Sequence, residues 1–404
     1  MLLPILTVLC CFAWTWLLWG QGNFWHLVLP RPLPVQPAYW PEVAIIVPAR
    51  DEAAMLPKTL PALLAQNYPG NWRILVVDDH STDGTAASAQ SLAAARGAVD
   101  RLQIIQPPTL PAGWSGKVHA MHCGVQAAGS VEYILFTDAD ILHQPNSLRF
   151  LVARAMYDQL DLHSMMVKLH CRSFWEKLLI PAYVYFFQML YPFHWSNTPS
   201  MKVAAAAGGV MLVYRPALEA IGGLESIKGK IIDDCALARA IKFRPNVTPP
   251  RTLITLVNHE VVSLREYASL MEIWRMVART AFTQLYHSWL LLIATIATLA
   301  LVFWLPLYLP ALGHLYTITG FVLLSGMLYS YLPLISFYRI NFLWAAALPI
   351  AAMIFMGATV DSAFRYAFGR GGQWKGRAQA HLPPTVAPPV SVDPASAPPA
   401  VPNP

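Results

Sequence analysis

The chain has 404 residues, of which 56% are hydrophobic and only 12% are charged. This composition is too apolar for an ordinary soluble domain and predicts membrane-spanning segments. The net charge of +6 is not gathered into a dense basic stripe with interleaved aromatic residues, so we expect no nucleic-acid partner. The 5 cysteines are an odd number without a C-x-x-C pair, which favours neither a disulfide framework nor a zinc site and indicates a reducing compartment.

The first residues of the chain are predicted to form a membrane anchor. Residues 1–19 carry no charge and end in a Trp-rich rim, which fits one tilted span of ~20 residues. The alternative is a cleaved signal peptide, but the stretch lacks the basic region and the small-residue cleavage site of such peptides. We therefore expect a transmembrane helix over residues 1–22.

Residues 40–262 are predicted to form one α/β domain. Short apolar runs indicate buried strands, and the stretches between them have helical spacing or are rich in Ala. The expected strands cover residues 43–47, 74–77, 102–105 and 133–137, and the expected helices cover residues 52–67 and 86–97. This alternation is typical of a Rossmann-like, mostly parallel sheet, whose ligands bind at the carboxyl ends of the strands.

Acidic loops follow three of these strands. They are PARDEA (48–53), DDHSTDGT (78–85) and DAD (138–140). Carboxylates gathered at one edge repel one another unless a divalent cation or basic ligand groups offset them. Because Mg2+ or Mn2+ held by few carboxylates completes its shell with substrate phosphates, we expect such a metal and a nucleoside diphosphate partner. Neither a P-loop nor a dinucleotide-binding glycine motif is present, and His119 and His122 are interpreted as structural side chains.

Five motifs together resemble the family 2 inverting glycosyltransferases of the GT-A fold, over about residues 40–280. The motifs are IIVPARDEA (45–53), VVDDHSTDGT (76–85), TDAD (137–140), AAGGVMLVYR (206–215) and IIDDCALA (231–238). Two further stretches, PAGWSGKVHAM (111–121) and WRMVARTAF (274–282), make the chain most similar to the membrane-bound, hopene-associated members. The resemblance implies a GT-A domain that uses a nucleotide-sugar donor, usually a UDP-sugar.

The resemblance also implies roles for residues around the donor. Asp51 and Asp79 match positions that contact the nucleobase and the ribose. Asp138 matches a position near the ribose and the metal, and Asp140 matches a ligand of Mg2+ or Mn2+. Lys117 matches a basic position near the donor, where an ammonium would offset diphosphate charge. A solvated loop lysine is the structural alternative for Lys117.

A second group of residues is implied in the catalytic step. Gly208 and Gly209 match a loop that passes close to the donor or acceptor sugar, where a missing Cβ permits backbone approach. Asp234, which forms an acidic pair with Asp233, matches the base that takes the proton of the acceptor hydroxyl. The structural alternative for this pair is a helix N-terminus, where two acids face the helix dipole favourably, and the two roles are compatible.

Residues 263–287 are predicted to form an amphipathic helix that lies on the bilayer beside the catalytic site. Apolar residues between Leu270 and Leu285 fall on one helical face, and packing of that face on the domain core is the alternative. Arg275 and Arg279 lie on the other face and are candidates for reaching the diphosphate. The Q-x-x-R-W motif of processive polysaccharide synthases is absent, so we do not expect a long polymer as product.

Three more apolar runs predict a C-terminal transmembrane bundle of about three helices over residues 288–366. Residues 378–404 are rich in Pro, Ala and Val and are predicted to be disordered. One span before the domain and three after it would place both termini outside the cell, which conflicts with the positive-inside tendency of the basic residues after the last run. Either one late segment is re-entrant, or this tendency is overridden.

The apolar run at residues 178–195 is also near spanning length. A crossing there would put Asp234 on the opposite side of the membrane from Asp140 and would dismantle the site. We therefore interpret the run as a membrane-dipping or acceptor-facing element.

Together these features predict a multi-pass protein of the bacterial inner membrane with a cytoplasmic catalytic domain. The expected activity is sugar transfer to a lipid in hopanoid or related isoprenoid lipid biosynthesis. The alternatives are a polyprenyl-phosphate or ceramide-like acceptor, a membrane nucleotidyltransferase, and a non-catalytic lipid-binding partner. The set Asp79, Asp138, Asp140 and Asp234 favours an enzyme, because a scaffold does not need all four carboxylates.

Overall fold

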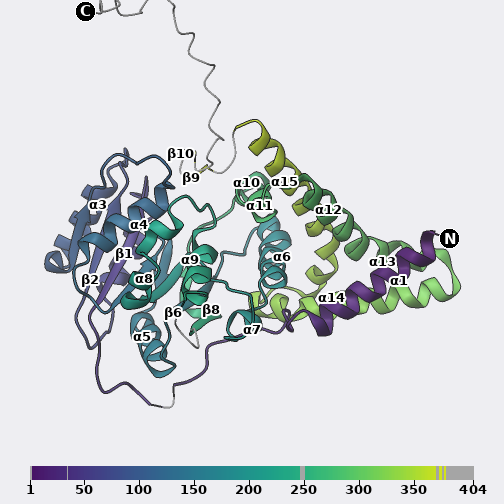
Figure 1. Cartoon of the computed structure of the whole chain (residues 1–404), viewed down its shortest axis with the longest axis horizontal. Helices are drawn as coiled ribbons and strands as arrows, with labels where there is room; N and C mark the ends of the chain where they lie inside the picture. The colour runs from purple at the N-terminus through teal and green to yellow at the C-terminus, as the bar shows by residue number, and fades with distance from the viewer. Residues whose placement is uncertain (1, 34, 246–250, 370–372, 375–376, 379–404) are drawn as a thin grey trace, which may run out of the picture.

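The computed structural model describes residues 2–33, 35–245, 251–369, 373–374 and 377–378, with a sheet domain at one end and long helices at the other (Figure 1). Within these residues the main sheet has 8 strands in the order β3-β2-β1-β4-β7-β6-β8-β5. The strands are β1 Val43–Ala49, β2 Trp72–Asp78, β3 Leu102–Ile105, β4 Tyr133–Thr137, β5 Ile141–His143, β6 Leu162–Lys168, β7 Val210–Tyr214 and β8 Thr252–Ser263, with β9 Gln373–Trp374 and β10 Arg377–Ala378 in a separate pair.

Strand β1 lies at the centre of the parallel part of the sheet. It pairs in parallel with β2 and β4, and β2 pairs in parallel with β3. Beyond β4 the sheet is mixed. Strand β7 is antiparallel to its neighbours β4 and β6, β6 and β8 run parallel, and the edge strand β5 is antiparallel to β8. The predicted Rossmann-like, mostly parallel sheet is therefore confirmed, and the four predicted strands are β1 to β4.

Helices cover both faces of this sheet. Those of the sheet domain are α2 Leu56–Leu64, α3 Thr85–Ala95, η2 Val99–Arg101, α4 Gly116–Ala127, α5 Ser147–Tyr157, α7 Phe193–Ser196, α8 Arg215–Ala220, η3 Gly223–Ile227 and α9 Asp233–Lys242. Neighbouring residues of a strand point to opposite faces. Ile45 of β1 accordingly lies in a core with side chains of α2, α3 and α5, and Ile46 lies in a second core with α4, α8 and α9.

Long apolar helices lie at both ends of the described chain. They are α1 Leu2–Thr15, continued by the π-helix η1 Trp16–Gly20, then α12 Trp289–Phe303, α13 Leu305–Tyr308, η4 Leu309–Leu312, α14 His314–Tyr338, η5 Phe342–Ala347 and α15 Leu348–Ala367. The stretches long and apolar enough to cross a membrane are Leu2–Gly20, Trp289–Leu312, His314–Tyr338 and Phe342–Ala367. This confirms the apolar helices expected at the two ends, whereas the tail predicted to be disordered lies, from residue 379 on, outside the described residues.

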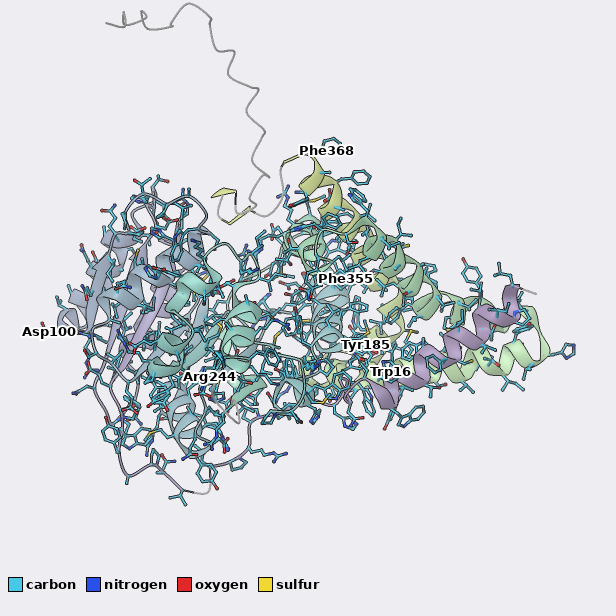
Figure 2. The ribbon with its side chains drawn as sticks, viewed as in Figure 1. Trp16, Asp100, Tyr185, Arg244, Phe355 and Phe368 are labelled. Atoms are coloured by element: carbon cyan, nitrogen blue, oxygen red, sulfur yellow. The ribbon has the colours of Figure 1, made fainter. Side chains whose placement is uncertain are left out.

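The run at residues 178–195 falls largely in α6 Phe174–Leu190, which joins the two halves of the molecule. Leu179, Ala182 and Val184 are fully buried in the core shared with the long helices. Figure 2 shows Tyr185 between the sheet domain and these helices, where its hydroxyl lies 2.8 Å from Ser330 Oγ of α14. Much of α6 is therefore a core helix. The apolar composition of residues 178–195 alone could not distinguish a core helix from a membrane-dipping element.

The single amphipathic helix expected over residues 263–287 is wrong. Strand β8 continues through Ser263, and the helical part is divided into α10 Leu270–Ala278 and α11 Ala281–Gln284. Ile273 of α10 is buried in the core shared with the long helices, and the indole of Trp274 would contact any Cβ added at Gly357 of α15. The apolar side of α10 is thus turned toward α15, and the expected contact with the bilayer stays a prediction.

Helix α15 and the short helix η5 before it contact α6 and α10. The ring of Trp344 in η5 lies 5.3 Å from that of Phe174 at the start of α6. Near the C-terminal end of α15, Asp361 Oδ2 accepts a hydrogen bond from the Trp274 indole at 2.7 Å. In Figure 1 the far ends of α14 and α1 lie much further from the sheet. The number of membrane crossings stays a prediction.

Candidate active site

The acidic loops meet at the carboxyl edge of the sheet. Ala49 at the end of β1 is in register with Asp78 at the end of β2, and the Asp79 N–H donates to the Ala49 carbonyl at 2.9 Å. On the other side of β1, the Asp138 N–H after β4 donates to the Gly209 carbonyl at 3.2 Å. The sequence-based expectation that these loops converge is therefore confirmed by the backbone.

The loops after β1 and β2 are joined through Asp51. This residue has a φ of 51°, in the left-handed backbone region that residues other than Gly, Asn and Asp rarely adopt. Its N–H donates to Ser81 Oγ at 2.9 Å, and its Oδ1 accepts from the Thr82 N–H at 2.9 Å. Asp51, which was predicted to contact the donor, thus also stabilises the loop in which it lies.

Asp79 lies deeper in the same edge. It is only 1% exposed, and its Oδ2 lies 3.5 Å from Arg50 Nη1. The same guanidinium donates to the Asp79 carbonyl at 2.6 Å. The sequence reading did not single out Arg50, although it stands directly before the Asp51 motif position.

Lys117 connects the two halves of the site from the first turn of α4. Its Nζ lies 2.8 Å from Asp138 Oδ1 and 3.7 Å from Asp233 Oδ2, and its side chain is 15% exposed. Burial lowers the pKa of Lys117, but the carboxylates of Asp138 and Asp233 outweigh it and raise the pKa above its ordinary value. Lys117 is therefore a charged, largely buried helix residue, and the solvated loop lysine considered as its alternative is wrong.

The glycine pair lies between Lys117 and Asp234. The Gly208 N–H donates to Asp234 Oδ2 at 2.9 Å, and a Cβ at Gly208 would lie 3.2 Å from Lys117 Nζ. The Gly209 carbonyl accepts from Thr137 Oγ1 at 2.9 Å. Gly208 thus permits the close approach expected from its position, and Gly209 ties this loop to the end of β4.

Asp233 and Asp234 are the first two residues of α9, so the helix N-terminus predicted as their alternative role is present. Asp234 Oδ1 accepts from the Cys235 N–H at 2.7 Å. Burial and the adjacent Asp233 raise the pKa of Asp234 to about 6, while Lys117 opposes this rise. A carboxylate with a pKa near neutral is suited to general-base chemistry, so the helix position is compatible with the catalytic role.

Asp138 and Asp140 form the candidate metal site. Burial and the neighbouring Asp138 raise the pKa of Asp140 to about 6, against the lowering effect of Arg265. A divalent cation would relieve this repulsion, and carboxylate oxygens are the ligands that Mg2+ and Mn2+ prefer. In the described part of the chain no group of 3 or more His, Cys, Asp or Glu side chains is placed to bind a metal ion. Two carboxylates do not fill the coordination shell of Mg2+ or Mn2+, so such a cation at Asp138 and Asp140 would complete its shell with substrate phosphates.

Arg275 and Arg279, the two candidates for reaching the diphosphate, differ in their surroundings. Arg279 follows α10, and its charge acts on Tyr183 of α6 and on Tyr267. Burial, then Asp234, raise the pKa of Tyr183, with Arg279 opposing them. Arg279 and Tyr183 therefore lie in the neighbourhood of Asp234, whereas no polar side-chain contact of Arg275 is found among the described residues.

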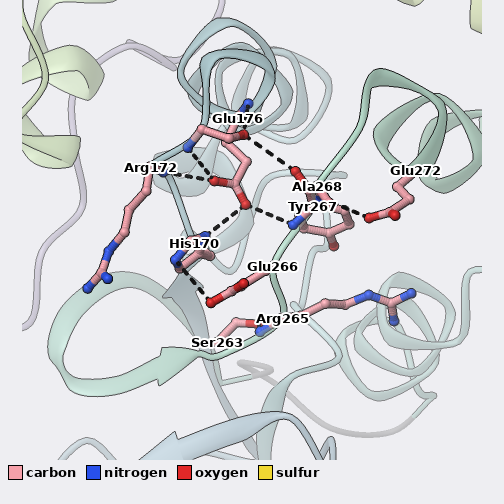
Figure 3. A network of polar contacts seen from close by, with 10 residues as sticks. His170, Arg172, Glu176, Ser263, Arg265, Glu266, Tyr267, Ala268 and Glu272 are labelled. Atoms are coloured by element: carbon pink, nitrogen blue, oxygen red, sulfur yellow. Dashed lines mark hydrogen bonds and ion pairs between the residues drawn. The ribbon is translucent and has the colours of Figure 1, made fainter.

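The structure adds a polar network that the sequence reading missed (Figure 3). Glu176 of α6 is 1% exposed, and its carboxylate accepts from His170 Nδ1 and from the backbone N–H groups of Arg172, Ser173 and Tyr267, each at 2.8 Å. Burial opposes these contacts, but together they lower the pKa of Glu176 to about 2. The S-x-x-E spacing from Ser173 to Glu176 is a capping-box signature and could have revealed the cap in the sequence.

A second buried polar chain lies behind the DAD loop. Thr137 Oγ1 lies 2.9 Å from His143 Nε2, and His143 Nδ1 lies 3.0 Å from Ser147 Oγ. Ser147 Oγ donates to Gln66 Oε1 at 3.0 Å. Burial lowers the pKa of His143 to about 3. Since Thr137 also donates to the Gly209 carbonyl, this chain connects the Gly209 loop to the start of α5 and to Gln66, just after α2.

His119 and His122 both lie on α4. Their rings are 5.6 Å and 4.8 Å from the Trp114 ring, and His119 Nε2 lies 3.7 Å from Cys123 Sγ. These contacts agree with the structural role that was predicted for the two histidines.

The sheet order, the acidic loops at its carboxyl edge and the glycine loop beside α9 together define a GT-A type domain. The sequence of residues 44–222 matches the family described as Glycosyl transferase family 2. The matched segment covers less than half of the chain. Asp234 lies beyond the matched segment, so its role rests on the geometry of the site.

Two known proteins illustrate the likeness. The protein named "Putative glycosyltransferase EpsE", from Bacillus subtilis (strain 168), is 34% identical over 116 residues, which is 28% of this chain and 38% of that protein. The match thus spans well under half the length of this relative. The mannosyltransferase PcManGT from Pyrobaculum calidifontis, solved with GDP-Man and Mn2+, has a TM-score of 0.56 at 19% identity, covering 91% of this chain and 99% of that one. At this identity the likeness shows the fold.

Proposed function

We propose that this chain is a membrane-bound, inverting glycosyltransferase that moves a sugar from a nucleoside diphosphate donor to a lipid acceptor. The observation that carries the proposal is the connection made by Lys117, which lies 2.8 Å from Asp138 on the donor side and 3.7 Å from Asp233 on the side of the catalytic base. A donor diphosphate and an acceptor hydroxyl would meet between these carboxylates. The match of residues 44–222 to glycosyltransferase family 2 supports the same conclusion.

The donor half of the site supports binding of a nucleotide sugar. Asp51 and Asp79 are proposed to contact the nucleobase and the ribose, and Asp138 the ribose and the metal. Lys117 would neutralise part of the diphosphate charge, because its ammonium stays protonated at neutral pH. The likeness to a mannosyltransferase solved with GDP-Man adds a GDP-sugar to the UDP-sugars expected from the sequence.

Asp234 is proposed to be the catalytic base. Its carboxylate takes the proton of the acceptor hydroxyl, the hydroxyl oxygen forms a bond to the anomeric carbon, and the bond from that carbon to the diphosphate breaks. The nucleoside diphosphate leaves with the electron pair of the broken bond, and the configuration of the sugar inverts. The Gly208 N–H, at 2.9 Å from Asp234 Oδ2, orients the carboxylate for this step.

Mg2+ or Mn2+ would be held by Asp140 and Asp138. When bound, it would supply positive charge that stabilises the leaving diphosphate. The raised pKa of Asp140 supports this assignment, because two carboxylates one residue apart stay ionised together more readily beside a cation.

A lipid acceptor is supported by the position of α6. Tyr183 lies close enough to Asp234 to sense its charge, and the same helix packs on α14 and α15. The base is thus close to a helix that packs on the long apolar helices, which suits an acceptor delivered from the membrane. The sequence resemblance favours a hopanoid or related isoprenoid lipid, and the alternatives are a polyprenyl-phosphate or a ceramide-like lipid. We propose the bacterial inner membrane as the location, with the catalytic domain on the cytoplasmic side.

The test is release of nucleoside diphosphate by the full chain reconstituted in lipid, with a panel of UDP- and GDP-sugars, Mg2+ or Mn2+, and bacterial lipid extract. We expect release that depends on lipid and metal, together with a glycosylated lipid detected by mass spectrometry. A lipid product that retains the nucleotide would instead identify a nucleotidyltransferase. No turnover and no donor binding across the panel would favour the non-catalytic lipid-binding partner.

A further inference from the structure

We propose that Arg265 binds the diphosphate of the donor and that Glu176 positions the segment that carries this arginine. The inference rests on the proposed function, which supplies the diphosphate. Arg265 follows β8 and is far from the DAD motif in the sequence, so no local pattern connects the two. The connection is made by the fold.

The backbone just after β8 is fixed against the DAD loop. The Leu264 N–H donates to the Asp140 carbonyl at 2.9 Å, and Ser263 Oγ lies 3.5 Å from Asp140 Oδ2. The Arg265 N–H donates in turn to Ser263 Oγ at 3.3 Å. The backbone of Arg265 is therefore one residue from a direct contact with Asp140, and its positive charge opposes the rise in the pKa of that carboxyl group.

The guanidinium of Arg265 is available for a ligand. The residue is exposed, and its Cζ lies 5.7 Å from the centre of the Tyr267 ring. Within the described part of the chain, no carboxylate lies at ion-pair distance from this guanidinium, although it acts on Asp140 electrostatically. A guanidinium binds two phosphate oxygens through parallel N–H groups, so this geometry suits the diphosphate of a donor bound beside Asp140.

Glu176 fixes the other end of the same segment. Its Oε1 accepts from the Tyr267 N–H at 2.8 Å, while Ser173 Oγ donates to the Tyr267 carbonyl at 3.4 Å. Residues 263–267 are therefore held at one end by Asp140 and at the other by the N-terminus of α6. Figure 3 shows Arg265 and Arg172 extending to opposite sides of this network. Because Glu176 is buried, it is a positioning residue, and its effect on the nucleotide passes through the backbone of Arg265.

The test measures nucleotide affinity of the full chain in detergent with Mn2+, by titration calorimetry with UDP, GDP, and the corresponding monophosphates and nucleosides. We expect Arg265→Gln to weaken diphosphate binding about 10- to 100-fold, the range for lost charge-assisted hydrogen bonds, with little effect on the nucleoside. Arg265→Lys should recover part of the loss. Glu176→Gln should give the same pattern with a smaller loss, roughly 3- to 10-fold, because it disorders the segment without removing the charge.

Arg172→Gln is the matched control, since it removes a nearby positive charge whose side chain points away from the segment. Equal diphosphate affinity in wild type and Arg265→Gln would overturn the assignment of Arg265, and so would equal losses in Arg265→Gln and Arg172→Gln. Both outcomes would leave the proposed function intact. Absence of nucleoside diphosphate binding by the wild type would overturn the proposed function as well, so the two failures are distinguishable.

Discussion

Replacing Asp234 by Asn tests the catalytic base most directly. The amide keeps the size of the side chain and an acceptor oxygen for one of the two N–H groups, of Gly208 and Cys235, that now donate to separate carboxylate oxygens at 2.9 Å and 2.7 Å. It cannot take a proton from the acceptor. General-base catalysis is worth about 10²- to 10⁴-fold in rate, or roughly 2.7 to 5.4 kcal/mol, so we expect a loss of this size in the transfer step.

The transfer rate should also depend on pH, in the direction set by ionisation of Asp234. With the pKa of Asp234 near 6, the base is ionised above this pH and protonated below it. The wild-type transfer rate should therefore be constant above about pH 7 and fall toward a tenth of that value near pH 5. In Asp234→Asn the residual rate should lose this dependence on pH. Asp140 has a pKa in the same region, so both donor and metal must be saturating, because a bound cation keeps Asp140 ionised over this range of pH.

The assay is single-turnover release of nucleoside diphosphate, with the protein in excess over the lipid acceptor and the donor saturating. Asp158→Asn is the matched control, because this carboxylate lies at the end of α5 and pairs with Arg154 at 3.1 Å, away from the site. It should keep the wild-type rate and pH profile. A rate for Asp234→Asn within tenfold of the wild type, with an unchanged fall below pH 6, would refute the assignment of Asp234 as base.

Three further predictions concern the metal, the capping network and the contact between the two halves of the molecule. Asp140→Ala should weaken Mn2+ binding, measured by electron paramagnetic resonance, at least roughly tenfold, and unchanged affinity would exclude it as a ligand. Glu176→Gln should lower the unfolding free energy by about 2 to 3 kcal/mol at pH 7. Because the folded pKa of Glu176 is lowered to about 2, this contribution is present above about pH 4.5 and disappears as the pH falls toward 2, so the wild type and variant should then unfold at the same temperature. Trp274→Phe removes the hydrogen bond to Asp361 and should cost about 2 kcal/mol, whereas Trp19→Phe, at a residue that is 73% exposed, should leave the melting temperature unchanged.

The parallel half of the sheet could be predicted because its signals are local. The apolar runs stop at Pro48, one residue before β1 ends at Ala49, and at Asp78, the last residue of β2. Strands with continuous apolar runs bury both faces, as Ile45 and Ile46 do here. The same reasoning placed the acidic loops at one edge, since parallel neighbours end together.

The rest of the site depends on contacts between distant residues. Arg265 reaches the DAD loop only because β8 pairs with β5, and that antiparallel pairing leaves no periodic trace in the sequence. The break between α10 and α11 has a similar origin. The Phe282 N–H donates to Ser362 Oγ of α15 at 3.0 Å, so a tertiary contact replaces the helical hydrogen bond that the amphipathic pattern had predicted. Glu176 could have been recognised as a cap, but its contact with Tyr267 could not.

The buried histidine behind the DAD loop does not titrate in the range of pH where the site acids do. His143 stays neutral well below pH 6, because burial lowers its pKa to about 3. Its contacts with Thr137 and Ser147, and through Thr137 with the Gly209 loop, therefore keep the same proton arrangement from mildly acidic to alkaline solution. A change of rate in that range consequently does not come from titration of His143.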